Sequence, residues 1–344
     1  MSLRVLIIDD SVLFHSQIQM VLRDLPDLVV VSTSANGSLA LEEVDLVIMD
    51  IDSPSIDGLN TIKEIRSKGT KTKILLFSPV SLTSTEKTFE GLRLGANDFA
   101  HKPAGDASAS DFCNKIKEVL VPKILGLFGK AVTNKISLSS QTVWETLNPK
   151  VLVIASSTGG PAALTDFFAN FKEPVSYPIL ITQHMPPLFT TAFAETLASV
   201  SGRVCKEAIQ GEVLVANQMY VAPGDFHLSV GGDKSRPIVI LDKGPQRNYV
   251  RPCADFLFES AAKIFGKNTL GIVFTGMGRD GADGAKVIKE MGGAILIQNE
   301  ASCAVFGMPG AIHEAGHFDF EGRPQELALK VQAISKIIRI GHVA

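Results

Sequence analysis

Short apolar runs and amphipathic helical stretches alternate regularly along this sequence, and few folds accommodate such a pattern. In the first part of the chain the strand-like runs lie at residues 4–8, 29–32, 45–49, 73–77 and 97–100. The helical patterns cover residues 13–25, 58–67, 85–94 and 111–125. Strand–helix alternation of this kind predicts a parallel sheet with helices on both faces. The fold class that we expect is therefore α/β, with doubly wound parallel sheets.

A break in this alternation divides the chain into two parts. From 128 to 149 the hydrophobic period is lost, and Asn148-Pro149 is a stop signal before the next strand. A chain of 344 residues is also too long for one ordinary domain. We therefore predict a first domain over 1–127, a linker over 128–149 and a second doubly wound domain over 150–344. Trp144 lies in this linker, and we expect it to pack into the interface that the linker crosses.

Composition and charge exclude several classes of protein. The net charge of −3 and the lack of a long basic run argue against a nucleic-acid partner. No apolar run approaches the ~20 residues that a membrane helix needs, and the first apolar stretch ends in two aspartates, unlike a secretory signal. The four cysteines lie far apart, which is typical of free thiols in a reducing compartment. We expect a cytoplasmic monomer without membrane insertion.

In the first domain, polar residues follow the predicted strands at their carboxyl ends. Asp9 and Asp10 follow the first strand, Asp50 the third, Ser78 the fourth and Lys102 the fifth. Converging carboxylates repel one another unless a hard cation lies among them, and Mg²⁺ prefers carboxylate oxygen. A lysine and a hydroxyl suit a phosphate, and one carboxylate can form an aspartyl-phosphate. The alternative is that the aspartates are only solvated helix caps. It is weaker because all five polar residues, the three aspartates with Ser78 and Lys102, follow predicted strands.

These stretches resemble the receiver domain of two-component response regulators, over the whole first domain. The matching stretches are residues 7–11, 49–54, 57–58, 78, 95–99 and 102–103. The resemblance implies a flavodoxin-like fold with Asp50 as the phosphoacceptor. It implies that Asp10 and Asp50 bind Mg²⁺ directly, that Asp9 assists the metal, and that the backbone carbonyl of Asp52 completes its shell.

The same resemblance assigns the residues that report phosphorylation. Ser78 and Phe99 would be the switch pair, with Lys102 beside the phosphoryl group. Two departures from the family pattern are visible: Ser53 stands where many receivers carry methionine, and Pro79 follows the switch hydroxyl where a small residue is usual. Neither departure falls in the acid cluster, but Pro79 leaves the form of the switch movement open.

Three strand-like runs of the second domain end in a hydroxyl, an imidazole and a carboxylate. The runs lie at residues 151–155, 178–182 and 270–275. They lead into Ser156 and Ser157, into His184 and into Asp280. Strand ends of an open parallel sheet face one crevice, and these groups are the parts of an acyl-transfer site. Taken singly, a serine here is an ordinary helix cap, and the histidine can be a structural residue.

The third run also matches a dinucleotide-binding pattern. Gly276, Gly278 and Gly281 form a GxGxxG motif between a strand and a helix, with Glu300 about twenty residues further on. Asp280, however, would place a carboxylate against the pyrophosphate. The motif also lies near the end of its domain and not at the first strand. We therefore disfavour a nucleotide site.

A second pattern, HExxH, runs from His313 to His317 and is typical of zinc proteases. It requires a continuous helix that brings both imidazoles to one face. Gly316 lies inside the motif, and the chain from Phe318 onward has the pattern of a strand. We expect a helix end followed by a turn, and no cofactor in this domain.

The second domain resembles the catalytic domain of chemotaxis protein-glutamate methylesterases, the CheB family. The matching stretches are residues 157–161, 181–186, 219–227, 251–252, 275–281 and 298–309. Receiver, linker and methylesterase in one chain is also the arrangement of that family, and it implies a Rossmann-like second domain. The alignment makes Ser157 the nucleophile. Ser156 stands where the family usually has alanine, so its hydroxyl stays open as an alternative.

The resemblance implies hydrolysis of glutamate γ-methyl esters on the cytoplasmic domains of chemoreceptors, and deamidation of glutamines at equivalent sites. Ser157 would attack the ester, His184 would move the proton, and Asp280 would orient the imidazole. Backbone N–H groups of Met277 and Thr158 would form the oxyanion hole. A chemotaxis histidine kinase would phosphorylate a receiver that otherwise covers the crevice. A serine hydrolase with another acyl substrate and a non-catalytic receptor or kinase adaptor remain alternatives.

Overall fold

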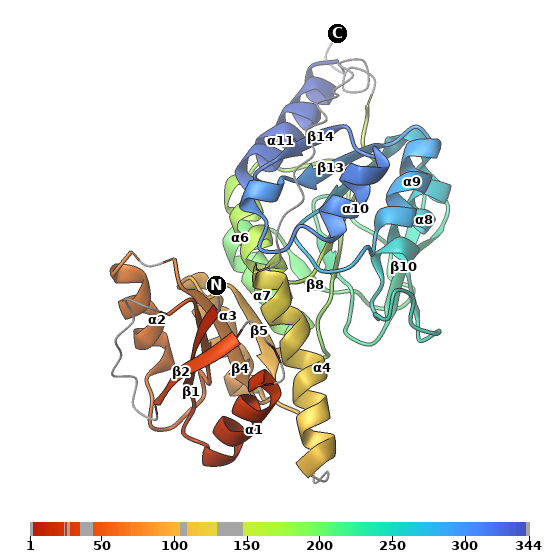
Figure 1. Cartoon of the computed structure of the whole chain (residues 1–344). Helices are drawn as coiled ribbons and strands as arrows, with labels where there is room; N and C mark the ends of the chain where they lie inside the picture. Colours follow the sequence, from red (N-terminus) through yellow and green to blue (C-terminus); the bar gives the residue numbers. More distant parts are fainter. Residues whose placement is uncertain are drawn as a thin grey trace. The chain divides into compact units, whose positions relative to one another are not determined.

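The computed structural model describes residues 3–23, 25, 28–34, 44–69, 71–103, 109–128 and 147–341. The chain divides into two compact units, Met1–Gly129 and Lys130–Ala344, both drawn in Figure 1. Residues 129–146 of the predicted linker, with Trp144, lie outside the described residues, so the linker and the packing of Trp144 stay predictions. No helix among the described residues is long and apolar enough to cross a membrane.

Within its described residues, the first unit is built on a five-stranded parallel sheet with the order β2-β1-β3-β4-β5. The strands are β1 (Leu3–Ile8), β2 (Leu28–Ser34), β3 (Leu46–Met49), β4 (Lys73–Ser78) and β5 (Asp98–His101). The helices are α1 (Val12–Arg23), α2 (Gly58–Ser67), α3 (Leu82–Arg93) and α4 (Ala109–Phe128). The predicted doubly wound α/β architecture is confirmed for this unit.

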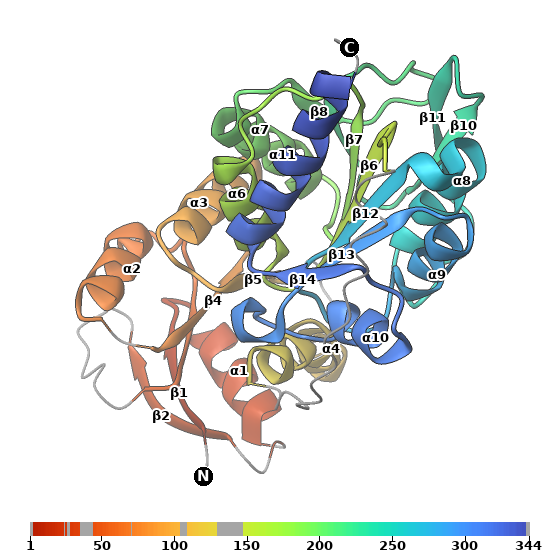
Figure 2. The same ribbon diagram turned by 90° about the horizontal axis from the view of Figure 1, so that it is seen from above.

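Helices cover both faces of this sheet. α1 packs against α4 on one face and α2 against α3 on the other (Figure 2). The inner strands are buried on both sides, so that Val5, Ile48 and Leu75 are at most 1% exposed. Strands covered on both faces are continuous apolar runs, which explains why the sequence marks them clearly. The chain changes direction across the sheet between β1 and β3, which places a crevice at their carboxyl ends.

Among the residues described for the second unit, seven parallel strands form a sheet with the order β14-β13-β12-β6-β7-β9-β8. The strands are β6 (Val151–Ser156), β7 (Ile179–Gln183), β8 (Cys205–Glu207), β9 (Met219–Val221), β12 (Thr269–Val273), β13 (Ala294–Gln298) and β14 (Phe320–Gly322). The strands β10 (His227–Gly232) and β11 (Pro237–Asp242) pair antiparallel beside it. The predicted fold class is confirmed here too.

The second sheet is also covered on both faces. Its helices are α6 (Gly160–Asn170), α7 (Phe189–Ser201), α8 (Ala254–Phe265), α9 (Ala282–Glu290), α10 (Met308–Ala315) and α11 (Pro324–Gly341). Figure 2 shows α6, α7 and α11 on one face and α8, α9 and α10 on the other. Successive crossovers run outward in opposite directions from β6, so the carboxyl ends of β6 and β12 border the crevice expected at such a switch point.

Two details of the second unit bear on the sequence interpretation. The strand predicted to end at residue 275 ends at Val273 instead. The N–H of Thr275 then donates to the side chain of Gln298 at 2.9 Å. The HExxH stretch is a helix end, as expected: α10 stops at Ala315, Gly316 takes a left-handed φ of 69°, and His313 bonds Glu321 at 2.9 Å. The two histidines therefore do not share a helix face.

Candidate active site

Two of the three candidate catalytic groups of the second unit meet at the carboxyl ends of their strands. His184 directly follows β7, and its Nε2 lies 2.7 Å from Oδ2 of Asp280, in the loop after β12. The side chains of His184 and Asp280 are 12% and 2% exposed. The backbone N–H of His184 also donates to the carbonyl of Ser156 at 3.1 Å, which fixes the histidine beside β6.

The carboxylate of Asp280 is surrounded by donors. Its Oδ2 accepts the N–H of Ala254 at 2.7 Å, and its Oδ1 accepts the N–H of Gly281 at 2.9 Å and the thiol of Cys253 at 2.9 Å. Burial raises the pKa of Asp280, but the hydrogen bond and charge of His184, with the Ala254 and Cys253 donors, outweigh it and hold that pKa well below its usual range. The Gly281 N–H that a dinucleotide site would offer to a phosphate is thus taken by this carboxylate.

Ser157 lies in the turn between β6 and α6, at the switch point of the sheet. Its N–H donates to the carbonyl of Thr275 at 3.0 Å, and its own carbonyl accepts the N–H of Gly160 at 2.8 Å. A Cβ on Gly276 would lie 2.8 Å from that of Ser157, so the serine faces the loop that carries Asp280. Within the described part of the chain the partly exposed Ser157 hydroxyl makes no hydrogen bond, which leaves it free to meet a substrate.

The neighbouring hydroxyl has a different environment. Ser156 is fully buried, and its Oγ donates to Oε1 of Gln183 at 2.6 Å. The amide nitrogen of Gln183 in turn donates to the carbonyls of Ser157 at 3.0 Å and His184 at 3.2 Å. Ser156 therefore connects β6 to β7 through Gln183, and the geometry favours Ser157 as the residue that reaches a substrate.

The N–H groups expected to form the oxyanion hole lie on the two loops that flank Ser157. Among the hydrogen bonds of the described residues, the backbone N–H groups of Thr158 and Met277 donate to no partner. The loops are tied together by Thr275, whose hydroxyl donates to the carbonyl of Thr158 at 2.9 Å and accepts the N–H of Val305 at 2.9 Å. Backbone donors held in this way suit a negative charge that develops during reaction.

The sequence interpretation missed several side chains of this site. Gln183, Asn248, Cys253 and Asp255 all contact the residues expected to be catalytic, directly or through one partner. Polar residues at a strand end or a helix start are ordinary caps by sequence alone. In the sequence, only their neighbours could have pointed to these residues: Gln183 directly precedes His184, and Cys253 directly follows the matching stretch at 251–252.

In the first unit the predicted acid cluster forms at the carboxyl ends of β1 and β3. Asp9, Asp10 and Asp50 each offer a carboxylate oxygen, and these atoms lie within 4.8 Å of one another. Nζ of Lys102 lies 2.7 Å from Asp9 Oδ2 and 2.5 Å from Asp50 Oδ2. Asp9 and Asp50 are only 2% and 6% exposed, so they are not solvated caps.

The donor set of this cluster fits Mg²⁺. Three carboxylates against one lysine leave an excess of negative charge, and every donor is a hard oxygen. Burial raises the pKa of Asp9, although the hydrogen bond and charge of Lys102 oppose it. The side chain of Asp52 is engaged elsewhere, by Ser84 and Lys87 at 2.6 Å each, so only its backbone carbonyl is left for the predicted role.

The predicted switch residues lie beside this cluster and in the core. The Ser78 hydroxyl accepts the N–H of Ile51, the residue after the predicted phosphoacceptor Asp50, at 3.2 Å. Phe99 is 6% exposed, and its ring lies 6.2 Å from that of Phe89. The role of the pair in signalling stays a prediction.

The two units define a class of protein: an α/β regulator in which a receiver-type acid cluster accompanies a hydrolase-type site. Residues 5–112 match the response regulator receiver domain, and residues 152–331 match the CheB methylesterase family. The chain accordingly belongs to the CheB methylesterase family, and it is an enzyme of the hydrolase class that carries a receiver domain.

Relatives along the whole chain support this assignment. The chain is 38% identical to a protein-glutamate methylesterase/protein-glutamine glutaminase of Nocardioides sp., over 91% of this chain and 90% of that protein. It is 36% identical to a protein of the same name from Trichodesmium erythraeum, over 98% and 99%. The crystal structure of the Thermotoga maritima CheB methylesterase catalytic domain is similar with a TM-score of 0.52 and 37% identity, over 56% of this chain and 100% of that one.

Proposed function

We propose that this protein hydrolyses glutamate γ-methyl esters, and deamidates equivalent glutamines, on the cytoplasmic domains of chemoreceptors. The observation that carries the proposal is the buried His184–Asp280 hydrogen bond of 2.7 Å, at the same strand ends as Ser157, whose hydroxyl makes no hydrogen bond among the described residues. A hydroxyl, an imidazole and an ionised carboxylate at one crevice are the parts of acyl transfer through a covalent intermediate. The substrate class comes from the names of the relatives.

The orientation of the imidazole decides which nitrogen moves the proton. Because Asp280 binds Nε2 of His184, the ring nitrogen left for Ser157 is Nδ1. Ser157 Oγ attacks the ester carbonyl carbon and its proton passes to Nδ1. The tetrahedral oxyanion accepts hydrogen bonds from the N–H groups of Thr158 and Met277. The C–O bond to the leaving group then breaks, methoxide takes the proton and departs as methanol, and water hydrolyses the acyl-enzyme by the same steps.

Asp280 keeps its charge throughout this cycle. Its depressed pKa means that the carboxylate is ionised at neutral pH. An ionised carboxylate only accepts hydrogen bonds, so it holds the proton of the imidazole on Nε2 and stabilises the imidazolium that forms.

The receiver cluster supplies the switch in this proposal. Asp10 and Asp50 would hold Mg²⁺ directly with help from Asp9 and the carbonyl of Asp52, and the ion would neutralise the phosphoryl oxygens at Asp50. Lys102 already contacts Asp50 at 2.5 Å and adds a positive charge there. A chemotaxis histidine kinase would donate the phosphoryl group in the cytoplasm, and phosphorylation would relieve a block of the esterase crevice by the receiver.

The test is release of methanol from methylated chemoreceptor by the wild type and by Ser157→Ala. We expect the variant to lose several powers of ten in rate, because the members of such a site act as a unit. A Ser157→Ala protein that works at near wild-type rate overturns the assignment of the nucleophile. A wild type that hydrolyses other esters but releases no methanol from the receptor has another acyl substrate, and one that hydrolyses neither supports the adaptor alternative.

A further inference from the structure

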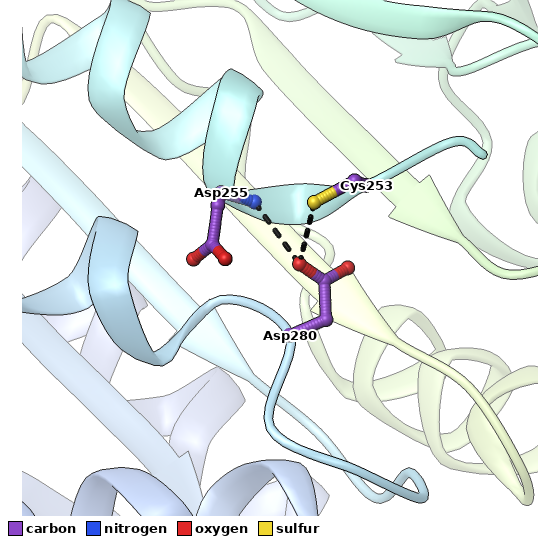
Figure 3. A group of neighbouring side chains, drawn as sticks. All are labelled: Cys253, Asp255 and Asp280. Carbon is purple, nitrogen blue, oxygen red and sulfur yellow. Dashed lines mark hydrogen bonds between the residues drawn. The ribbon is translucent and has the colours of Figure 1, made fainter. Parts of the chain in front are cut away.

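A group of hydrogen-bond donors lies behind the His184–Asp280 pair, on the oxygen of Asp280 that is not bonded to the imidazole. Figure 3 shows Cys253 and the backbone N–H of Asp255 directed at this oxygen, Oδ1. The thiol lies 2.9 Å and the N–H 3.3 Å from it. Nδ2 of Asn248 approaches the same oxygen at 3.3 Å. The two oxygens of the carboxylate thus have separate partners, with only Oδ2 bonded to His184.

The direction of the Cys253 hydrogen bond follows from its surroundings. Cys253 is fully buried at the start of α8. Burial, with the neighbouring charge of Asp280, raises the pKa of this thiol far above neutral, so it keeps its proton. An ionised carboxylate has no proton to give. The thiol is therefore the donor, and Asp280 Oδ1 is the acceptor.

Asn248 is held in place by an unusual turn. It has a left-handed φ of 56°, and the N–H of Val250 closes the turn by donating to the carbonyl of Arg247 at 3.1 Å. The side chain of Arg247 anchors the turn through Glu259 at 2.7 Å. The amide nitrogen of Asn248 then donates to Asp255 Oδ2 at 2.8 Å as well as to Asp280.

Asp255 places a second carboxylate near that of Asp280, with one oxygen of each within 4.8 Å. It is fully buried, and its Oδ1 accepts the N–H of Gly284 at 2.8 Å. Two neighbouring carboxylates compete for charge, and the one with more donors ionises more easily. The donors on Asp280 Oδ1 therefore keep the negative charge on Asp280, whose other oxygen, Oδ2, is bonded to His184. Cys253, Asp255 and Asp280 each have hydrogen-bond partners within the chain, so we interpret this group as a hydrogen-bonding network.

We propose that Cys253 and Asn248 are positioning residues for the esterase reaction, which bind Oδ1 of Asp280 so that Oδ2 alone is presented to the imidazole of His184. The inference rests on the proposed function, because it takes His184 and Asp280 as the reacting pair. Neither positioning residue touches the reacting atoms; both act through the carboxylate.

The role has a consequence for pH dependence. A donor on Oδ1 draws negative charge away from Oδ2, so its removal strengthens the attraction between Asp280 and a protonated imidazole. The protonated form is inactive as a base. The acidic limb of the kcat/KM profile, which reports protonation of the general base in the free enzyme, should then move to higher pH. A purely structural role for Cys253 would lower stability and leave the limb in place.

The experiment measures this profile for Cys253→Ala, Cys253→Ser and Asn248→Gly, with a small activated ester such as p-nitrophenyl acetate. Serine keeps a donor at the position, and glycine adopts the left-handed φ of Asn248 without strain. Cys205→Ala is the matched control, because Cys205 is a thiol in β8, at the far edge of the same sheet. We expect Cys253→Ala and Asn248→Gly to move the acidic limb up by roughly half a pH unit or more and to lower kcat more than they raise KM. Cys253→Ser should restore both values, and Cys205→Ala should change neither.

A second readout does not depend on turnover. The N–H proton shared by His184 and Asp280 gives a low-field proton resonance, which is assigned by its loss in His184→Gln. We expect this resonance to move further downfield in Cys253→Ala and to return in Cys253→Ser. If the limb and the resonance stay unchanged in Cys253→Ala and in Asn248→Gly, the positioning role is wrong. If both move but the wild type releases no methanol from methylated receptor, the positioning role stands and the proposed substrate falls.

Discussion

At the scale of single residues, two adjacent serines have different roles because their environments differ. Ser156 is buried and donates to Gln183, whereas the Ser157 hydroxyl is partly exposed and unbonded within the described residues. The resemblance predicts Ser157 as the nucleophile, but the sequence alone keeps the Ser156 hydroxyl as an alternative, because a shift of one residue along a strand end changes the hydrogen-bond partner of a side chain. Only the position of Gln183 on the next strand decides between them.

The two serines should respond differently to the same substitution. Ser156→Ala removes the donor to Gln183 Oε1, so we expect the free energy of unfolding to fall by about 1–2 kcal/mol while most methanol release survives. Ser157→Ala should show the reverse, with near-normal stability and almost no activity. Urea unfolding and methanol release on both variants provide the comparison. A Ser156→Ala protein as inactive as Ser157→Ala would contradict the assignment.

The paired carboxylates predict how stability depends on pH. Burial and the charge of Asp280 raise the pKa of Asp255 from 3.8 to about 6, so the stability due to Asp255 is present below pH 3.8 and is lost as the pH rises through about 6. Asp280, with a depressed pKa, behaves oppositely, and its contribution is lost only as the pH falls below 3.8. Asp255→Asn lacks this contribution, so we expect the unfolding free energy of the wild type to fall relative to that of the variant as the pH rises from 3.8 to about 6. An identical pH dependence in both proteins would show that Asp255 ionises normally.

At the scale of elements, the start of α6 explains why the turn after β6 is rich in glycine. A Cβ on Gly160 would lie 2.1 Å from Gln183 Oε1 and 2.8 Å from Ser156 Cβ, so the helix approaches β7 too closely for any side chain. The same approach lets Gln183 bind the carbonyl of Ser157. The packing of α6 against the strand ends and the position of Ser157 therefore depend on the same close approach.

Gly160→Ala should damage activity more than stability. The added methyl group displaces Gln183, and with it the carbonyls of Ser157 and His184, by a few tenths of an ångström or more. We expect a loss of roughly 10- to 100-fold in kcat, because small misplacements of reacting groups are costly. Gly202→Ala is the control: it strains a left-handed residue after α7 but meets no atom within 4 Å. If Gly202→Ala lowers kcat equally, the effect of Gly160→Ala is general destabilisation.

The sequence predicted the elements better than it predicted their contacts. The runs at 4–8 and 73–77 differ from β1 and β4 by one residue at one end, because strands buried on both faces have to be apolar throughout. Cys253 and Asn248 could not be found in this way. Their partner, Asp280, lies 27 and 32 residues away, and no periodic pattern links polar residues that meet across loops.

At the scale of the whole molecule, the acid cluster of Asp9, Asp10 and Asp50 and the candidate site of Ser157, His184 and Asp280 lie in separate units, each with its own sheet. A regulatory unit with its own core can be removed without exposing the core of the other. We expect residues 150–344 alone to hydrolyse methylated receptor faster than the unphosphorylated full chain, because the proposed block is absent. Equal rates for the fragment and the full chain would count against blocking by the receiver.

Removal of Mg²⁺ should affect only the proposed phosphorylation of the first unit. The proposed ligands Asp9, Asp10 and Asp50 all belong to the first unit, and the esterase site uses none of them. Chelation with EDTA should therefore abolish the stimulation by a phosphoryl donor and leave the basal rate of methanol release unchanged. Asp50→Asn should behave in the same way with Mg²⁺ present. A basal rate that falls with EDTA would place a required metal in the esterase unit.

The central claim is that phosphorylation of Asp50 controls an ester hydrolysis carried out by Ser157. The most direct measurement is methanol release from methylated chemoreceptor with and without acetyl phosphate, for the wild type, Asp50→Asn and Ser157→Ala. We predict a rate that rises several-fold with the donor in the wild type, stays at the basal level in Asp50→Asn, and is almost lost in Ser157→Ala under both conditions. A rate of methanol release that does not change with acetyl phosphate, or that persists in Ser157→Ala, would contradict the account.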